Sequence, residues 1–406
     1  MIQSSHNPHN PVIKEESNQQ RIFGLDLFRA LSIVAVFLSH SIDLNPLKKE
    51  FPYFAWLGFG VEAFFVLSGF LIGRIILQTF FQKAITWEVI ASFWINRWFR
   101  TIPAYLFTLF IYFLFFPHFG LKIISYLFFL QNAITPIPYL FPHSWSLSVE
   151  EWFYFSFPII IWVTYILQKK TQHPYKIFIF SSLTLIFIGF MCRTVLYFIA
   201  NHTSIIHTAI KQGYLFPSWG TFLTPYYWDT MRKMTFFRID SIAFGCIIAY
   251  VFETNKELLL KNHIKLFITG LLLLFLSYFL FVKNVINGKP NVISDIILLP
   301  IFSLSFSFLI PTFISTPVPN KNRIFKITHT ISLTSYSFYL IHLLVIDLFF
   351  QNFNTQNTSC LKTTITFATC YLATFLLSYL MYNYIEKPFL SYRTTINKKI
   401  FSKNKK

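Results

Sequence analysis

Charged side chains are scarce in this sequence, since only 12% of its 406 residues are Asp, Glu, Lys or Arg. A soluble domain carries roughly 25% charged residues, because water must wet its surface. Half of that supply leaves too little polar side chain to cover a water-facing surface of this size. The composition therefore excludes an ordinary soluble globular protein.

Acidic residues are rarer still, with 16 Asp and Glu against 34 Lys and Arg, so the formal net charge is +18. Such an excess can indicate nucleic-acid binding, but the aromatic residues lie in apolar runs and are not interleaved with a basic patch. Cytoplasmic loops of membrane proteins carry the same excess of Lys and Arg. Nucleic acid is therefore not an expected partner.

Cysteine is also sparse, and no secretory leader is evident. Cys192, Cys246, Cys360 and Cys370 have neither metal-binding nor redox spacing. Three of them lie in apolar runs, where a thiol behaves as a small hydrophobe. Because no small-residue cleavage site follows the first apolar run, that run is expected to remain as an uncleaved anchor.

Hydrophobic residues make up 54% of the chain and include 53 Phe. Apolar runs of about 20 residues recur, which is the length that crosses a hydrocarbon core. The pattern predicts an all-α polytopic integral membrane helix bundle of about ten transmembrane helices. The run 121–132 is too short to cross and is expected to be interfacial or re-entrant. The expected spans are 25–43, 57–78, 101–117, 147–167, 177–200, 237–253, 266–282, 291–313, 330–350 and 362–385.

The distribution of basic residues predicts the orientation. With the N-terminus inside, 22 of the Lys and Arg residues fall on the inner side and nine on the outer side, and three lie within spans. This bias predicts that both termini are cytoplasmic, which requires an even number of crossings. We expect a disordered cytoplasmic tail at 1–24, one membrane domain at 25–389 and a basic cytoplasmic tail at 390–406.

The first span contains Arg29 and His40, eleven positions apart. Eleven residues make roughly three helical turns, so both side chains lie on one face. Arg29 is either a snorkelling anchor paired with Asp26 or a functional charge. His40 is either a helix–helix hydrogen-bonding group or a proton-transfer group, and we favour the second, because imidazole exchanges a proton near neutral pH.

Two further clusters carry charge close to spans. In HSWSLSVEEWFYF, Glu150 and Glu151 point about 100° apart, so at most one faces a given site. Either one of these glutamates serves a functional site, or the segment is an aromatic belt at the membrane interface with solvated carboxylates. In FWINRWFRTIPAYLF, Arg97 and Arg100 share a face just before the third expected span. They suit phosphate recognition or ordinary positive-inside anchoring.

Seven short segments of this sequence, taken in chain order, resemble the family 3 membrane acyltransferases, which include O-acetyltransferases of bacterial surface polysaccharides. The Arg-x10-His pattern of that family falls on Arg29 and His40, and its Arg-x-x-Arg pattern falls on Arg97 and Arg100. The Trp-Ser-Leu-x-x-Glu element of the family ends on Glu150. One departure is Glu62, where Asp is common. The segments are GLDLFRALSIVAVFLSH, GVEAFFVLSGFLIGRII, INRWFRTIPAYL, HSWSLSVEEWFYF, RIDSIAFGCIIAY, SYSFYLIH and YIEKPF.

The resemblance implies transfer of an acyl group, expected to be acetyl, from acetyl-CoA. The implied acceptor is a hydroxyl of a surface glycan, such as lipopolysaccharide, or of its lipid-linked precursor in the bacterial inner (cytoplasmic) membrane. The expected catalytic residues are His40, as base or transient acyl carrier, with Arg29 and Glu150. Arg97 and Arg100 are expected to hold donor phosphates, and no metal is expected. The main alternative is a transporter or flippase of a lipid-linked glycan, and a third is a structural or sensory subunit.

Overall fold

The computed structural model describes most of the chain, and every element in the described part is a helix. The expected N-terminal tail lies almost wholly outside the described residues. The described residues are 22–43, 57–80, 85–116, 120, 123–133, 140–168, 174–201, 231–283, 291–319, 322–351 and 360–402.

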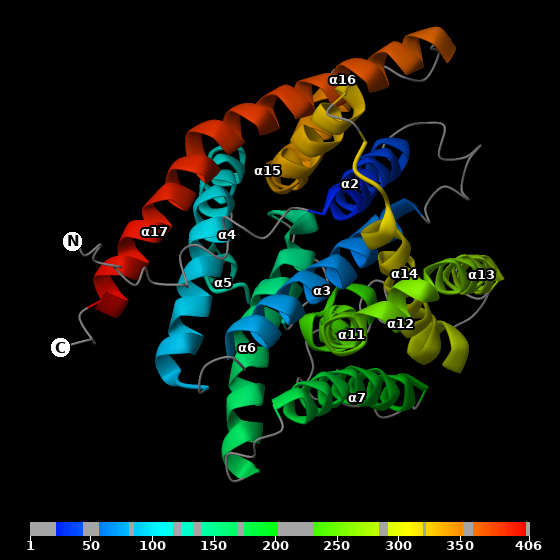
Figure 1. Cartoon of the computed structure of the whole chain (residues 1–406). Coiled ribbons are helices and arrows are strands. Elements are labelled where there is room, and N and C mark those ends of the chain that lie inside the picture. The colour runs from blue at the N-terminus through cyan, green and yellow to red at the C-terminus, as the bar shows by residue number, and fades with distance from the viewer. Residues whose placement is uncertain are drawn as a thin grey trace, which may run out of the picture.

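Nine helical segments in these ranges are long and apolar enough to cross a membrane. They coincide with nine of the ten expected spans, which confirms the all-α membrane bundle (Figure 1). Their helices are α2 (Phe23–Asp43), α3 (Gly60–Phe80), α4 (Trp87–Phe115), α7 (Pro174–Asn201), α11 (Thr235–Thr254), α13 (His263–Phe281), α14 (Leu298–Ser315), α15 (Arg323–Gln351) and α16 (Cys360–Met381).

The remaining expected span forms α6 (Trp145–Leu167), which is 23 residues long but is not one of the nine. It carries the adjacent carboxylates Glu150 and Glu151 in its first two turns. In the described part of the run at 121–132, residues 123–132, the helix α5 (Ile123–Leu127) is five residues long and turns follow it, so this part is too short to span a membrane, as predicted.

The predicted start of the third span is wrong. The span was expected at 101–117, but α4 begins at Trp87. The helix starts earlier because the preceding residues are also apolar, and it buries Ile90 and Phe93 against the core. Arg97 and Arg100, which were expected just before this span, therefore lie within the long helix α4.

Helices α2 and α15 pack side by side and run parallel. Near the start of α2, Arg29 donates to Ser332 Oγ at 3.4 Å, and near its end His40 Nδ1 lies 2.8 Å from His342 Nε2. The earlier residue on α2 contacts the earlier residue on α15, and the later contacts the later, so the two helices point in the same direction. Parallel neighbours in a membrane cross it in the same direction, which constrains the topology of the whole chain.

Helices α3 and α11 approach each other closely, because glycines face each other across the contact. A Cβ on Gly69 would lie 1.8 Å from the carbonyl oxygen of Ile242, and one on Gly245 would lie 2.0 Å from that of Val66. Small residues let membrane helices bring their backbones together in this way.

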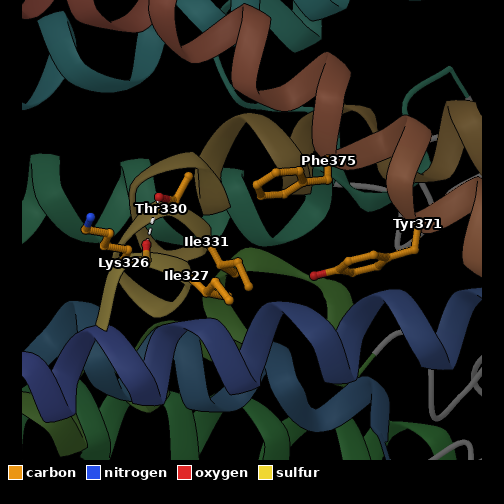
Figure 2. Close-up of a pocket in the computed structure, with 6 residues that line it drawn as sticks. All are labelled: Lys326, Ile327, Thr330, Ile331, Tyr371 and Phe375. Carbon is orange, nitrogen blue, oxygen red and sulfur yellow. Dashed lines mark hydrogen bonds between the residues drawn. The ribbon is translucent and has the colours of Figure 1, made fainter. Parts of the chain in front are cut away.

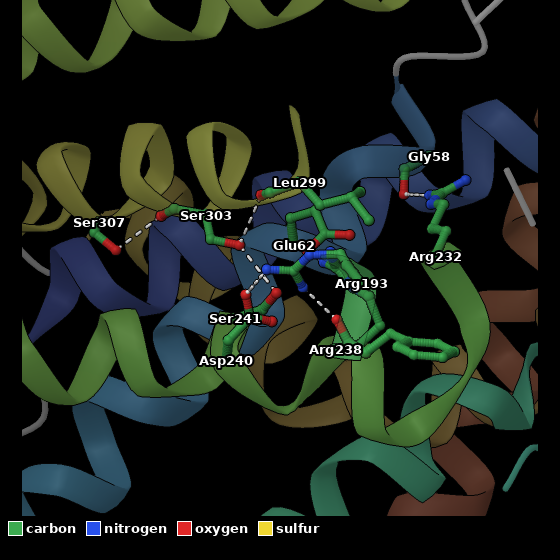
Figure 3. Close-up of polar contacts among 11 residues, drawn as sticks. Gly58, Glu62, Arg193, Arg232, Arg238, Asp240, Ser241, Leu299, Ser303 and Ser307 are labelled. Carbon is green, nitrogen blue, oxygen red and sulfur yellow. Dashed lines mark hydrogen bonds and ion pairs between the residues drawn. The ribbon is translucent and has the colours of Figure 1, made fainter. Parts of the chain in front are cut away.

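Two fully buried ion pairs join α11 to its neighbours (Figure 3). Arg193 of α7 lies 2.7 Å from Asp240, and Arg238 pairs with Glu62 of α3. Breaking a buried pair leaves an uncompensated charge and costs roughly 3–5 kcal/mol. The acidic residue at position 62 thus has a structural partner.

The C-terminal end of the described chain is one continuous helical rod. Helix α16 passes through the π-helical turn η9 (Tyr382–Glu386) into α17 (Lys387–Ser402). The rod runs along the edge of the bundle beside α4 and α15 (Figure 1). The expected boundary of a basic tail at residue 390 falls inside α17 and stays a prediction.

Candidate active site

Three histidines from three elements meet at one end of the bundle. His40 ends α2, His143 lies in the short helix η4 (Pro142–Ser144) and His342 lies in α15. The ring centroids of His40 and His342 are 5.0 Å apart, and those of His143 and His342 are 4.8 Å apart. These three residues are the histidine cluster.

The members of the histidine cluster differ in accessibility. His342 has 0% and His143 has 2% of its surface exposed, whereas His40 is partly exposed. Burial, with His342 close by, lowers the pKa of His143 well below its ordinary value, so His143 is neutral near pH 7. Within the cluster, His40 is the member that a substrate can reach.

Tyr339 joins the histidine cluster to α6. Its hydroxyl donates to the carbonyl oxygen of His143 at 2.9 Å and lies 2.6 Å from Ser146 Oγ. The next turn of α6 brings Glu150, which accepts hydrogen bonds from Ser68 at 3.1 Å and from Tyr154 at 3.0 Å. Glu150 thus accepts hydrogen bonds from hydroxyl groups on α3 and α6. His40 is hydrogen-bonded to His342 and not to Glu150.

The two arginines of α4 face different neighbours. The Arg97 guanidinium lies 4.5 Å from the centre of the Tyr154 ring, and its charge acts on Glu150. Arg100 is exposed, and its charge acts on Glu386 in η9. The structure therefore brings Arg97 to Glu150 but does not bring the two arginines onto one common group.

Arg29 lies at the opposite end of α2 from His40, in a polar group of its own. It lies 3.9 Å from Asp26 and donates to Ser332, which in turn donates to Asp26 at 2.6 Å. His329 lies 3.4 Å from the same carboxylate. The expected Asp26–Arg29 pair is present, and it is tied to α15.

Together these groups form a polar track through the bundle, contributed by α2, α3, α4, α6 and α15. The histidine cluster and Tyr339 lie at one end, Glu150 follows with Arg97 beside it, and Arg29 lies toward the other end. Charged and polar groups are costly within a membrane and usually face the bundle interior where they serve function. The track is therefore the candidate active site.

Arg232 is one of the nine basic residues expected on the outer side, and the structure places it beside this site. It donates to the carbonyl oxygen of Gly58 at 2.8 Å and lies 4.8 Å from the Phe59 ring centre, and its charge acts on His40 (Figure 3). Nothing local in the sequence marked Arg232, because its neighbours come from distant helices. His342, in contrast, lies in the SYSFYLIH segment, where a role had not been assigned.

A pocket of about 350 Å³ lies between α15 and α16, and none of the predicted site residues lines it (Figure 2). It is mostly apolar, and Tyr371 at one end packs on the rings of Phe37 and Phe338. Phe338 in turn stacks on His342 of the histidine cluster. The lining residues of the pocket are Lys326, Ile327, Thr330, Ile331, Tyr371 and Phe375.

No group of three or more His, Cys, Asp or Glu side chains suited to a metal ion occurs within the described ranges. Ring nitrogens of His40 and His342 face each other, and His342 and His143 each direct a ring nitrogen to a backbone carbonyl oxygen of α15.

The helical bundle defines a polytopic membrane protein with a cluster of histidines in its interior. A family model described as an acyltransferase domain matches residues 22–383. The chain therefore belongs to acyltransferase family 3, as the sequence motifs predicted.

Curated relatives carry related names. The Staphylococcus aureus (strain COL) protein named "Putative O-acetyltransferase SACOL0978" is 28% identical over 359 residues, which cover 80% of this chain and 50% of that protein. "O-acetyltransferase OatA" of Staphylococcus aureus (strain NCTC 8325 / PS 47) is 28% identical over 279 residues, or 61% of this chain and 38% of the relative. The chain spans half or less of the length of these relatives. No solved structure matches it.

Proposed function

We propose that the protein is a membrane O-acetyltransferase that moves an acetyl group from acetyl-CoA to a hydroxyl of a surface glycan or its lipid-linked precursor. Family membership supports acyl transfer. The names of the relatives support acetyl as the group and oxygen as the acceptor atom.

One observation carries this proposal. His40 keeps accessible surface while its Nδ1 is held 2.8 Å from His342 Nε2. An imidazole in this setting can accept a proton from a hydroxyl and return it. Direct acyl transfer to a hydroxyl needs that step.

In the proposed reaction the acceptor oxygen bonds to the thioester carbonyl carbon, and its proton passes to His40. The carbon–sulfur bond then breaks, and the departing CoA thiolate takes the proton. A variant of this route has His40 carry the acetyl group transiently. Glu150 would orient the acceptor, and Arg29 would supply positive charge at the other end of the track.

Arg97 and Arg100 are the proposed donor-binding residues. Guanidinium groups bind phosphate oxygens well, and Arg100 is exposed. Because Arg97 lies beside Glu150, we propose that Arg100 meets the donor phosphates first and Arg97 lies deeper along the track. The site is proposed to lie in the bacterial cytoplasmic membrane, with both termini in the cytoplasm.

A transporter or flippase of a lipid-linked glycan is the alternative function, and it would use the same polar track without a chemical step. Membranes from cells with and without the protein, supplied with acetyl-labelled CoA and cell-envelope glycan, separate the two. We expect label in the glycan only when the protein is present. Movement of glycan across the membrane without label transfer would support the transporter instead.

A further inference from the structure

We infer that His342 is a positioning residue that fixes the tautomer and ring orientation of His40, so that His40 Nε2 is the nitrogen that takes the proton. The inference rests on the proposed function and names a second residue for the same site. It follows from a chain of hydrogen bonds in which each acceptor determines the next donor.

The chain begins at the backbone of α15. His342 Nδ1 lies 2.6 Å from the carbonyl oxygen of Tyr339. A carbonyl oxygen only accepts hydrogen bonds, so His342 Nδ1 must carry the hydrogen. In a neutral imidazole the other nitrogen is then bare, and His342 Nε2 must act as an acceptor.

The second hydrogen bond, from His40 on α2 to His342, then determines which nitrogen of His40 carries the hydrogen. His40 Nδ1 lies 2.8 Å from the bare His342 Nε2, so His40 Nδ1 must donate. The same rule then leaves His40 Nε2 without a hydrogen. In this way a backbone carbonyl on one helix selects the basic nitrogen on another.

Burial assigns the two histidines different roles. His342 has no exposed surface, so it cannot touch a substrate, whereas His40 is partly exposed. The Phe338 ring, one turn earlier on α15, stacks on His342 with the ring centroids 6.5 Å apart. His342 therefore acts through His40, as the partner that orients a catalytic histidine does in other enzymes.

The other groups that face His40 do not duplicate this bond. His143 donates from Nε2 to the carbonyl oxygen of Leu340 at 3.0 Å. Arg232 and Lys233 act on His40 through their positive charge. Both are cations without an acceptor, so neither can receive the hydrogen of His40 Nδ1.

Two substitutions test the inference by acetyl transfer to glycan. His342→Gln keeps an amide N–H for the Tyr339 carbonyl and an amide oxygen for His40, whereas His342→Leu keeps neither group. We expect His342→Leu to lower kcat by about 100-fold or more with little change in either KM, and His342→Gln to recover much of that loss. His263→Leu on α13, a histidine bonded to Thr312 and remote from the cluster, should leave kcat unchanged.

Non-additivity supplies the second test. Because His342 acts only through His40, adding His342→Leu to His40→Ala should cost no further activity. A further loss in the double variant, or equal losses for the folded Gln and Leu variants at position 342, would overturn the inference. Full activity of His342→Leu would do the same.

A third readout does not depend on activity. Nitrogen-15 labelling of histidine distinguishes the two neutral tautomers, and the His40 signals are assigned by their absence in His40→Ala. We expect His40 to carry its hydrogen on Nδ1 in the wild type and to lose that preference in His342→Leu. If no acetyl transfer occurs in the wild type, the proposed function fails, yet the tautomer measurement still decides the role of His342.

Discussion

At the scale of single residues, His40 combines accessible surface with one firmly held nitrogen. His40→Ala removes the proposed proton-transfer group but leaves the apolar face of α2 intact. We expect at least a 100-fold loss of acetyl transfer, since general acid–base groups contribute about 10²–10⁴-fold. The measurement is labelled acetate in glycan, normalised to the amount of protein in the membrane. Near-normal transfer by a well-inserted His40→Ala protein would remove His40 from the mechanism.

Arg97 and Arg100 make a second residue-scale prediction. Hydrogen bonds to charged groups contribute about 1.5–3 kcal/mol each, so losing one phosphate contact should weaken donor binding roughly tenfold or more. We expect Arg100→Ala to raise the KM for acetyl-CoA with little effect on the KM for the acceptor. Arg97→Ala should also lower kcat, because Glu150 and Tyr154 lose their neighbouring cation.

The matched control is Arg323→Ala, which removes an exposed cation from the start of α15. It tests whether any loss of basic charge on the predicted cytoplasmic side weakens donor use. Equal KM changes for Arg100→Ala and Arg323→Ala would argue against a phosphate site on α4.

At the scale of helices, the contact between α3 and α11 holds the bundle together beside the site. A methyl group on Gly69 or Gly245 would meet backbone atoms at about 2 Å, and no side-chain rotation relieves such a clash. We expect Gly69→Ala and Gly245→Ala each to lower the free energy of unfolding by about 1–3 kcal/mol, the usual cost of overpacking. Thermal unfolding in detergent measures this loss.

Val195→Ile is the control for that experiment. It adds one carbon on α7 at a side chain that is 55% exposed, where there is room. Its unfolding temperature should match that of the wild type. Unchanged stability of both glycine variants would show that the two helices do not pack as closely as the structure has them.

At the scale of the whole molecule, the parallel arrangement of α2 and α15 bears on the number of crossings. Two parallel spans must be separated by an odd number of crossings. The described helices of 18 residues or more between them are α3, α4, α6, α7, α11, α13 and α14, so their count is odd only when α6 crosses as well. This geometry supports ten crossings, although α6 is not one of the nine candidate spans described above.

Cysteine labelling tests this topology. In a background without the native cysteines, Phe236→Cys at the start of α11 should react with a membrane-impermeant reagent added from outside. Lys176→Cys at the start of α7 should be protected until the membrane is opened. Both positions are exposed on the protein, so membrane side and not burial decides the result. Labelling of Lys176→Cys with protection of Phe236→Cys would contradict ten crossings with both termini inside.

The sequence by itself determined which segments are helices that cross the membrane and which family the chain resembles. Hydrophobic length is a local property, so apolar runs identify spans without knowledge of their neighbours. The predicted start of α4 was wrong because the helix continues in the N-terminal direction past Arg97 and Arg100, where the hydropathy pattern had indicated its edge. His40 stood out for a similar local reason, since an ionisable group inside an apolar run is conspicuous.

Only the tertiary structure decided the partners of these residues. The bond between His40 and His342, the position of Arg232 beside Gly58, and the pairing of Glu62 with Arg238 all join distant parts of the chain. Such contacts depend on how each helix is rotated and how far it slides along its neighbour. Close glycine contacts and buried ion pairs set that rotation and register, and neither can be read from a single run of residues.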